Sequence, residues 1–296
     1  MLIFLFASIL ATTGIASAAV NDSDGDRIID YLDPFPTQVE EKGDIWKVGD
    51  WMNFTFTSPT LSGYLYQEVV DIKTIEILDE NGTIKGSQEF YIFNRTHPRA
   101  GLIQVYFLTD GWNTYKMDFA NPNLLDITYV PSYDWGNNPY FEGKTWKYNL
   151  TQIQSNATIK KSVELTLNCA IGKETITVPA GTFGAFVIEC KMSDPPTGNL
   201  VSNSKYWIYK NESINSVIVV KTESYNVTSG APTETLSLNA ASRPGIPKPT
   251  IPATTPTKPA PGFELIAAAI GVTIAIHLSC LLYTSPSPRD RQKSSM

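Results

Sequence analysis

The sequence predicts a mainly β protein, built as a curved antiparallel sheet, a half-barrel or a sandwich. Between Ile45 and Asn239, apolar and polar residues alternate in runs rich in β-branched and aromatic side chains, as strands with one buried face require. Turn-forming residues separate these runs, for example at Asp79–Gly82. No segment in this range has the spacing of a long amphipathic helix, which favours antiparallel strands joined by hairpins.

One hairpin is predicted at Glu174–Lys191. Pro179 cannot donate a backbone hydrogen bond and Gly181 tolerates a positive φ, so the chain is expected to reverse between Val178 and Phe183. One face of this hairpin should lie in a core. The apolar residues that alternate with their neighbours and are expected on that face are Ile176, Val178, Phe186 and Ile188.

A weak internal repeat divides this predicted domain into two parts. The order of an apolar residue, a glycine, a tryptophan, an aromatic residue and a threonine occurs in Ile45–Thr57 and again in Tyr140–Thr151. Such self-similarity predicts two related β halves of about a hundred residues each. We expect them at residues 45–138 and 139–239. In the first copy, the side chains expected to share one strand face are Met52, Phe54 and Phe56.

Composition and motifs argue against several classes of function. The 296-residue chain has a formal net charge of −6 and no Lys/Arg cluster in its middle, so we expect no nucleic-acid partner. The HExxH, GxSxG and CxxC patterns and phosphate-cradling glycine loops do not occur. His97 lies in a turn-like sequence and is expected to be a loop residue rather than a base. A non-catalytic protein is therefore predicted.

One alternative is catalytic. Asp134 and Glu142 flank an aromatic stretch, Trp135–Phe141. Two carboxyl groups roughly 5–10 Å apart across a cleft are the machinery of glycoside hydrolysis. The alternative prediction is thus a surface glycan hydrolase that uses this pair, although two solvated loop acids are the simpler interpretation.

The acidic segment Asp22–Asp33 (DSDGDRIIDYLD) predicts a Ca²⁺ site. Aspartates stand at positions 1, 3, 5, 9 and 12 of the segment, and position 7 would offer a backbone carbonyl, as in an EF-hand-type loop. Arg27 replaces the glycine of position 6. Without a cation the carboxylates would repel one another, and the alternative is a solvated acidic linker. The predicted ligands are Asp22, Asp24, Asp26, Ile28, Asp30 and Asp33.

This segment, with its exit Asp33–Pro36, resembles the acidic calcium repeats of thrombospondin type 3. The resemblance implies a cation with a structural role rather than a sensory one. Residues 20–36 would then be a rigid spacer between the membrane or wall and the folded domain.

The two ends of the chain predict export and anchoring. Residues 1–19 carry the apolar run and the small-residue cleavage site of a signal peptide. Residues 240–261 are rich in proline and threonine and predict an extended stalk. Residues 279–296 look like translated adapter or vector sequence, so no chemistry is assigned to His277 or Cys280.

The tripeptide Pro261–Phe263, followed by the apolar run Leu265–Ile276, resembles the PGF-CTERM sorting signal of archaeal surface proteins. The resemblance implies that residues 262–283 are a sorting and transmembrane segment. It also implies an archaeosortase-type processing enzyme as a partner and a lipid anchor in the cell envelope.

Three motifs of the β domain, Gly143–Tyr148, Val178–Phe183 and Tyr206–Tyr209, resemble those of exported prokaryotic domains of the DUF3108 and LolA-like families. The resemblance implies a curved antiparallel sheet with a concave apolar face, in which a lipid or another apolar ligand could lie. The alternative is that these aromatic residues simply fill the core.

An exported domain would also permit a disulfide and glycans. A bond between Cys169 and Cys190 is expected, although in a flat three-strand meander the two would lie on the outer strands, about 9–10 Å apart at ~4.8 Å per strand. The sequence thus predicts a glycosylated, envelope-anchored archaeal surface protein with a structural or ligand-binding role. Its Asn-x-Ser/Thr sequons begin at Asn21, Asn53, Asn81, Asn94, Asn149, Asn156, Asn211 and Asn226.

Overall fold

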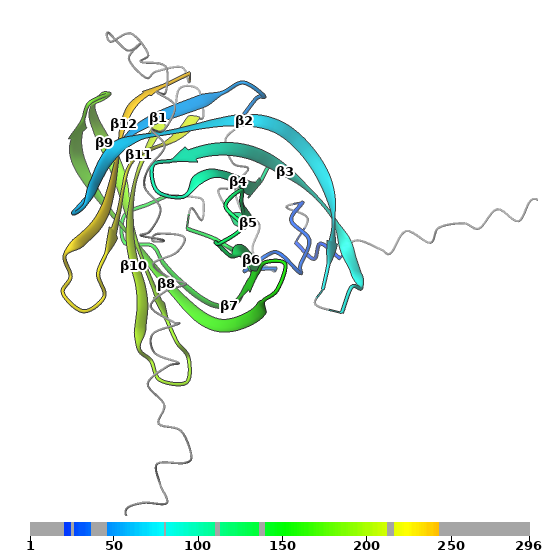
Figure 1. Ribbon diagram of the computed structural model, residues 1–296. Coiled ribbons are helices and arrows are strands. Elements are labelled where there is room, and N and C mark those ends of the chain that lie inside the picture. Colours follow the sequence, from blue (N-terminus) through cyan, green and yellow to red (C-terminus); the bar gives the residue numbers. More distant parts are fainter. Residues whose placement is uncertain are drawn as a thin grey trace, which may run out of the picture.

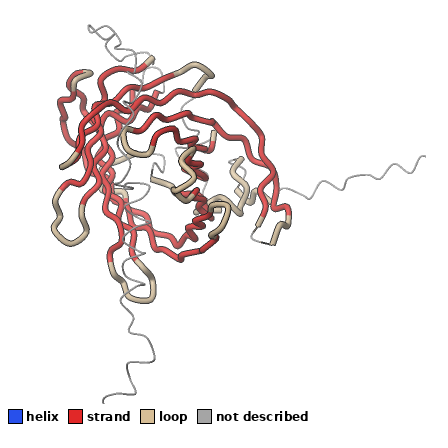
Figure 2. Tube along the Cα trace, viewed as in Figure 1, coloured by secondary structure: helices blue, strands red, loops and turns tan. Residues whose placement is uncertain are grey.

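The computed structural model of the protein describes residues 21–24, 27–36, 46–79, 81–109, 113–135, 140–211 and 216–242. Within these residues the chain forms strands and no helix (Figure 2). The predicted signal peptide, sorting segment and non-native tail lie outside the described residues, as does all but the first part of the predicted stalk. The strands are β1 (Trp51–Ser58), β2 (Leu61–Leu78), β3 (Ile84–His97), β4 (Gly101–Leu108), β5 (Thr114–Phe119), β6 (Asp126–Tyr133), β7 (Thr145–Ser155), β8 (Lys160–Val178), β9 (Gly181–Ser193), β10 (Leu200–Asn211), β11 (Ser216–Tyr225) and β12 (Pro232–Ala241).

The strands close into an antiparallel barrel (Figure 1). Each strand pairs with the next in the chain, and β1 pairs with β12, from Met52 opposite Ala241 to Thr57 opposite Thr235. The predicted mainly β antiparallel fold is confirmed. The sheet is a closed barrel rather than a half-barrel, because its first and last strands pair and leave no free edge.

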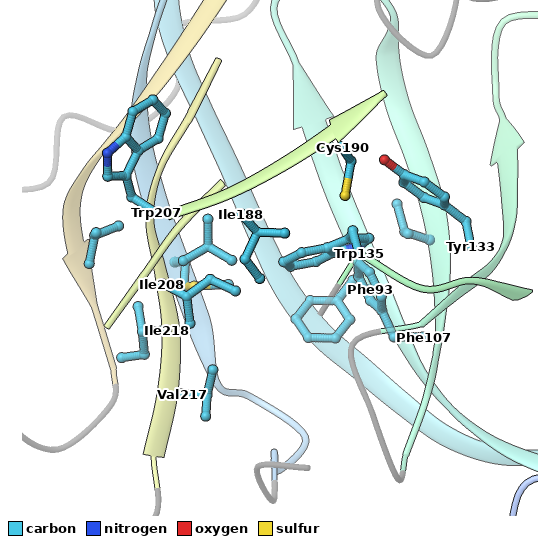
Figure 3. Close-up of a cluster of buried hydrophobic side chains, with 14 of the residues drawn as sticks. Phe93, Phe107, Tyr133, Trp135, Ile188, Cys190, Trp207, Ile208, Val217 and Ile218 are labelled. Atoms are coloured by element: carbon cyan, nitrogen blue, oxygen red, sulfur yellow. The ribbon is translucent and has the colours of Figure 1, made fainter. Parts of the chain in front are cut away.

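The core of the barrel follows from strand alternation. In β1, Met52, Phe54 and Phe56 are buried as predicted, while the residues between them are partly exposed. Inward side chains from all around the barrel meet in one cluster. In Figure 3, Phe93 and Phe107 lie beside Trp135, which follows β6, so strands distant in sequence share this core.

The two copies of the internal repeat occupy equivalent places in the barrel. Gly49, before β1, donates its backbone N–H to Val69 O of β2 at 2.8 Å. Gly143, before β7, donates in the same way to Ile171 O of β8, also at 2.8 Å. Both glycines have a positive φ, +91° and +86°. Six strands follow each turn, so β1–β6 and β7–β12 correspond to the two predicted halves.

The β8–β9 hairpin reverses at the expected place, with Val178 opposite Gly181. Its burial pattern differs from the prediction, because the buried positions of β9 change parity between Ala185 and Ile188, and Phe186 is only half-buried. The tip is tied to β12, where Ala180 N–H donates to Leu238 O at 2.9 Å. The tip is therefore covered by β12, and the hairpin is not buried along one face only.

Cys169 and Cys190 form a disulfide between β8 and β9. The two residues lie directly opposite each other, with their Cα atoms 4.2 Å apart. The expected separation in a three-strand meander was wrong, because β8 runs unbroken from Lys160 to Val178 and no strand lies between the two cysteines.

The acidic N-terminal segment packs against the outer face of the barrel wall (Figure 1). Ile28, Ile29 and Leu32 are buried with Phe90 of β3 and Leu108 of β4. These two strand residues point away from the interior, because their neighbours of opposite parity belong to the inner core. The segment is therefore part of the folded domain, and neither the solvated-linker alternative nor the spacer describes its packing.

Two hydrogen-bonded contacts fix that packing. Ile29 N–H donates to Oε1 of Gln88 at 3.1 Å. Leu32 O accepts from both the backbone N–H and the hydroxyl of Ser132 in β6, at 2.9 and 2.7 Å. The segment thus bridges β3 and β6 across the outer wall.

Candidate functional site

A cavity of about 200 Å³ lies inside the barrel. Aromatic and aliphatic side chains from β1, β4 and β12 form its apolar side, including Phe54, Val105, Phe107 and Leu236. Polar side chains from β2, β3, β10 and β12 form the rest, and the lining reaches the β11–β12 turn at Asn226. A concave apolar space with a few convergent polar groups is the usual form of a small-molecule site.

Arg95 supplies a positive charge to this cavity. It lies on the inward side of β3, two residues beyond the core residue Phe93. Its Nε–H donates to Oε1 of Gln67, directly across on β2, at 3.0 Å. Burial lowers the pKa of Arg95 to about 10, opposed by the negative charge of Glu234. The guanidinium is therefore charged at neutral pH.

Two tyrosines and a tryptophan line the cavity together. The hydroxyls of Tyr133 in β6 and Tyr206 in β10 are 3.0 Å apart. Trp135 stacks on Tyr206 with ring centroids 4.6 Å apart, and its Nε1–H donates to Oγ1 of Thr114 at 3.3 Å. Burial raises the pKa of both tyrosines. These phenols therefore stay neutral hydrogen-bonding groups.

Glu234 and His97 form a second polar pair of the interior. Nε2 of His97 lies 3.7 Å from Oε1 of Glu234. Nδ1 of His97 accepts the N–H groups of Arg99 and Ala100, at 3.1 and 3.2 Å, so Nε2 carries the ring proton that faces the carboxyl group. Burial raises the pKa of Glu234, and His97 opposes this. His97, predicted as a loop residue, is instead the buried last residue of β3.

Two buried glutamines extend the polar interior along β7. Nε2 of Gln154 donates to Oε1 of Gln152 at 2.7 Å. Nε2 of Gln152 in turn donates to the hydroxyl of Tyr129 at 3.3 Å. Tyr129 also lines the cavity, so this row of amides is connected to the site through one phenol.

The predicted calcium loop has a sharp turn at its sixth position. Arg27 has a φ of +81° and is the one non-glycine residue with positive φ among the described residues. It thus adopts the conformation for which EF-hand loops use glycine. Its backbone N–H donates to Oδ2 of Asp22 at 3.1 Å. The side chain of position 1 therefore closes the turn at position 6.

The structure describes most of the other predicted ligands. Asp30 accepts from the backbone N–H and the hydroxyl of Ser23, at 2.8 and 2.7 Å, and Asp33 accepts from Phe35 N–H at 2.6 Å. Asp26 lies outside the described residues. Among the acidic, histidine and cysteine side chains that the structure describes, no group of three is arranged to hold a metal ion.

The two carboxylates of the hydrolase alternative occupy different environments. Asp134 is fully buried, and its backbone carbonyl accepts from Nε1 of Trp146 at 3.1 Å. Glu142 is exposed. Neither residue lines the cavity.

The asparagines of the described sequons lie on turns and strands, and some are exposed while others are half-buried. Asn81 is exposed in the β2–β3 turn, Asn149 is exposed on β7, and Asn21 is exposed in the acidic segment. Oδ1 of Asn156 and Oδ1 of Asn226 each accept backbone N–H groups within their turns. Asn53 and Asn94 are half-buried on strands, and the side chain of Asn211 lies outside the described residues.

Sequence reasoning missed the charged residues of the cavity. The signal was available for Arg95, because it continues the inward side of Phe93 in an alternating strand and so predicts a charge pointing into the core. Glu234 carried the same signal, because it shares the parity of Leu236 and Leu238 in an alternating run. Tyr206 was singled out by its motif, but its place in a cavity depended on barrel closure.

These features together define a closed antiparallel β-barrel with an amphipathic internal cavity. No family model matches the sequence, and no curated protein matches it. Among the described residues there is no helix of the length and apolar character needed to cross a membrane.

Two solved structures are similar in fold at a low level. One is a protein of Parabacteroides distasonis provisionally described as a lipoprotein, with a TM-score of 0.42 and 14% identity over 69% of this chain and 100% of that chain. The other is a Bacteroides fragilis protein provisionally described as exported, with a YmcC-like fold, a TM-score of 0.38 and 15% identity over the same shares. Similarity at this level carries no argument about function.

Proposed function

We propose that this protein is an exported, envelope-anchored binding protein of an archaeal cell surface, and that its barrel holds a small molecule with an apolar body. The cavity of about 200 Å³ inside the barrel is the observation that carries this proposal. An engineered apolar cavity of about 150 Å³ binds benzene, so the space suits a substituted ring or a short alkyl chain. Export and anchoring rest on the sequence of the two ends.

The binding role is tested with a neutral probe. Isothermal titration calorimetry of the full chain with 2-phenylethanol should show saturable binding. A Val219→Phe variant should lose it, because Val219 is buried and lines the cavity. Val70→Phe is the matched control, because this residue lies at an exposed position of β2 and does not line the cavity. Binding that both variants retain, or no binding at all, would contradict the proposal.

The acidic segment is proposed to hold one structural Ca²⁺. The spacing of its aspartates and the left-handed turn at Arg27 support this. Such an ion would be held by the carboxylates of Asp22, Asp24, Asp26, Asp30 and Asp33 and the carbonyl of Ile28, and would supply positive charge among them. Its role would be to hold the segment against the outer wall of β3 and β4.

Surface anchoring makes a separate, simple prediction. Mass spectrometry of the mature chain from its native cells should find cleavage near residue 19, glycans on exposed sequons and processing near Gly262. An unmodified chain in the cytosol would contradict the location without affecting the binding proposal. No observation in the described residues favours the hydrolase alternative.

A further inference from the structure

The barrel cavity contains a cation, the guanidinium of Arg95, that no carboxylate of the described residues pairs with. In the described part of the chain, the guanidinium of Arg95 makes one hydrogen bond, from Nε to Oε1 of Gln67. Among the described residues, no carboxylate lies within ion-pair distance of it. Arg95 is half-buried, and a charge withdrawn from water without a counter-ion is costly. Such groups concentrate at functional sites.

The acid whose charge acts on Arg95, Glu234, is already engaged elsewhere. Glu234 affects Arg95 electrostatically, but its Oε1 faces Nε2 of His97. Its Oε2 is buried and has no hydrogen-bond partner in the described part of the chain. Glu234 therefore moderates the positive charge of the cavity without pairing with Arg95.

The wall around Arg95 is polar on one side and apolar on the other. Tyr206 lies close enough for the charge of Arg95 to lower its pKa, against the larger opposing effect of burial. Phe54, Val105 and Leu236 line the apolar side. One end of a ligand would thus meet N–H and O–H donors, and the rest would meet hydrocarbon.

We infer that the ligand of this cavity is a small monocarboxylic acid with an apolar body, whose carboxylate binds the guanidinium of Arg95. This inference rests on the proposed binding function and adds the class of ligand. The planar guanidinium offers two parallel N–H donors that match a carboxylate. A dianionic phosphate is disfavoured, because Glu234 also lines the cavity and would repel a second negative charge.

Three matched probes test the ligand class by calorimetry on the full chain. Phenylacetate should bind at least about tenfold more tightly than 2-phenylethanol, since hydrogen bonds to a charged partner are the stronger ones. Phenyl phosphate should bind more weakly than phenylacetate. In Arg95→Met, phenylacetate should lose its advantage while 2-phenylethanol still binds. Lys147→Gln, which removes one positive charge from an exposed position of β7, should leave the preference unchanged.

The outcomes separate the two proposals. Equal binding of phenylacetate and 2-phenylethanol by the unaltered chain would overturn the carboxylate inference and leave the binding function standing. Binding of neither would overturn both. Tighter binding of phenyl phosphate would assign the site to a phosphorylated ligand and also overturn the inference. If Arg95→Met does not fold, Arg95→Gln and the probe preference of the unaltered chain still decide the question.

Discussion

Arg95 and Cys190 occupy the same position in the two halves of the barrel. Val69 and Ile171 are equivalent, because each accepts the N–H of the repeat glycine, and they pair with Phe93 and Ile188. Two residues further along β3 and β9 lie Arg95 and Cys190.

Their partners across the ladder are also equivalent. Gln67 precedes Val69 by two residues, just as Cys169 precedes Ile171. The second half thus carries a covalent bond where the first half carries a hydrogen-bonded polar pair that lines the cavity. The two halves share the same strand arrangement and differ at this cross-strand pair.

The disulfide should stabilise the second half. Replacing both Cys169 and Cys190 by alanine is expected to lower the free energy of unfolding by about 3 kcal/mol, because the bond closes a loop across 21 residues in the unfolded chain. Urea unfolding followed by tryptophan fluorescence measures this. Equal midpoints for the oxidised and reduced chain would argue against a stabilising bond.

The two repeat glycines should be equally sensitive to substitution. Gly49→Ala and Gly143→Ala should each lower the free energy of unfolding by roughly 1 kcal/mol, because a left-handed φ strains any residue with a Cβ. The added methyl group would meet no atom within 4 Å at either site, so the cost is backbone strain alone. Gly172→Ala is the control, since it is equally open and its φ is not positive. A loss at Gly172 as large as at the other two would refute this explanation.

Calcium should stabilise the folded chain. At about a hundredfold excess over its Kd, Ca²⁺ is expected to raise the melting temperature by roughly 5–10 °C. Asp24→Ala combined with Asp26→Ala should abolish both this shift and the binding heat in calorimetry. The matched control removes two exposed carboxylates outside the loop, Glu76 and Glu142. No binding heat in the unaltered chain would rule out the site.

Glu234 should make stability depend on pH. Burial raises the pKa of Glu234 above its ordinary value of 4.5, so the folded state favours the protonated form. Its contribution is fully present below pH 4.5 and is lost as the pH rises through the folded pKa.

The isosteric Glu234→Gln variant tests this dependence. Relative to the unaltered chain, its free energy of unfolding should increase with pH across that window, by about 1.4 kcal/mol for each unit by which the pKa is raised. Urea unfolding between pH 4 and pH 8 gives the comparison. Parallel profiles of the two chains would show that Glu234 does not titrate differently in the folded state.

Local pattern was enough to predict much of the fold. Alternation placed Met52, Phe54 and Phe56 on one face, and proline and glycine placed the β8–β9 turn. Both signals depend on neighbours in the chain, since a strand has a period of two and a tight turn has few residue types available. Strand lengths were less predictable: local pattern did not show that β8 runs unbroken from Lys160 to Val178, so the expected three-strand meander misplaced the cysteines.

The sequence by itself determined the β class, the turns, the internal repeat and the acidic spacing of the N-terminal segment. Tertiary structure decided that β1 meets β12, that Ile28 and Leu32 cover the outer wall, and that Arg95 and Tyr206 line the same cavity. The reason is physical. Alternation says which side of a strand is buried, whereas the position where distant strands meet depends on the twist and register of all the strands together.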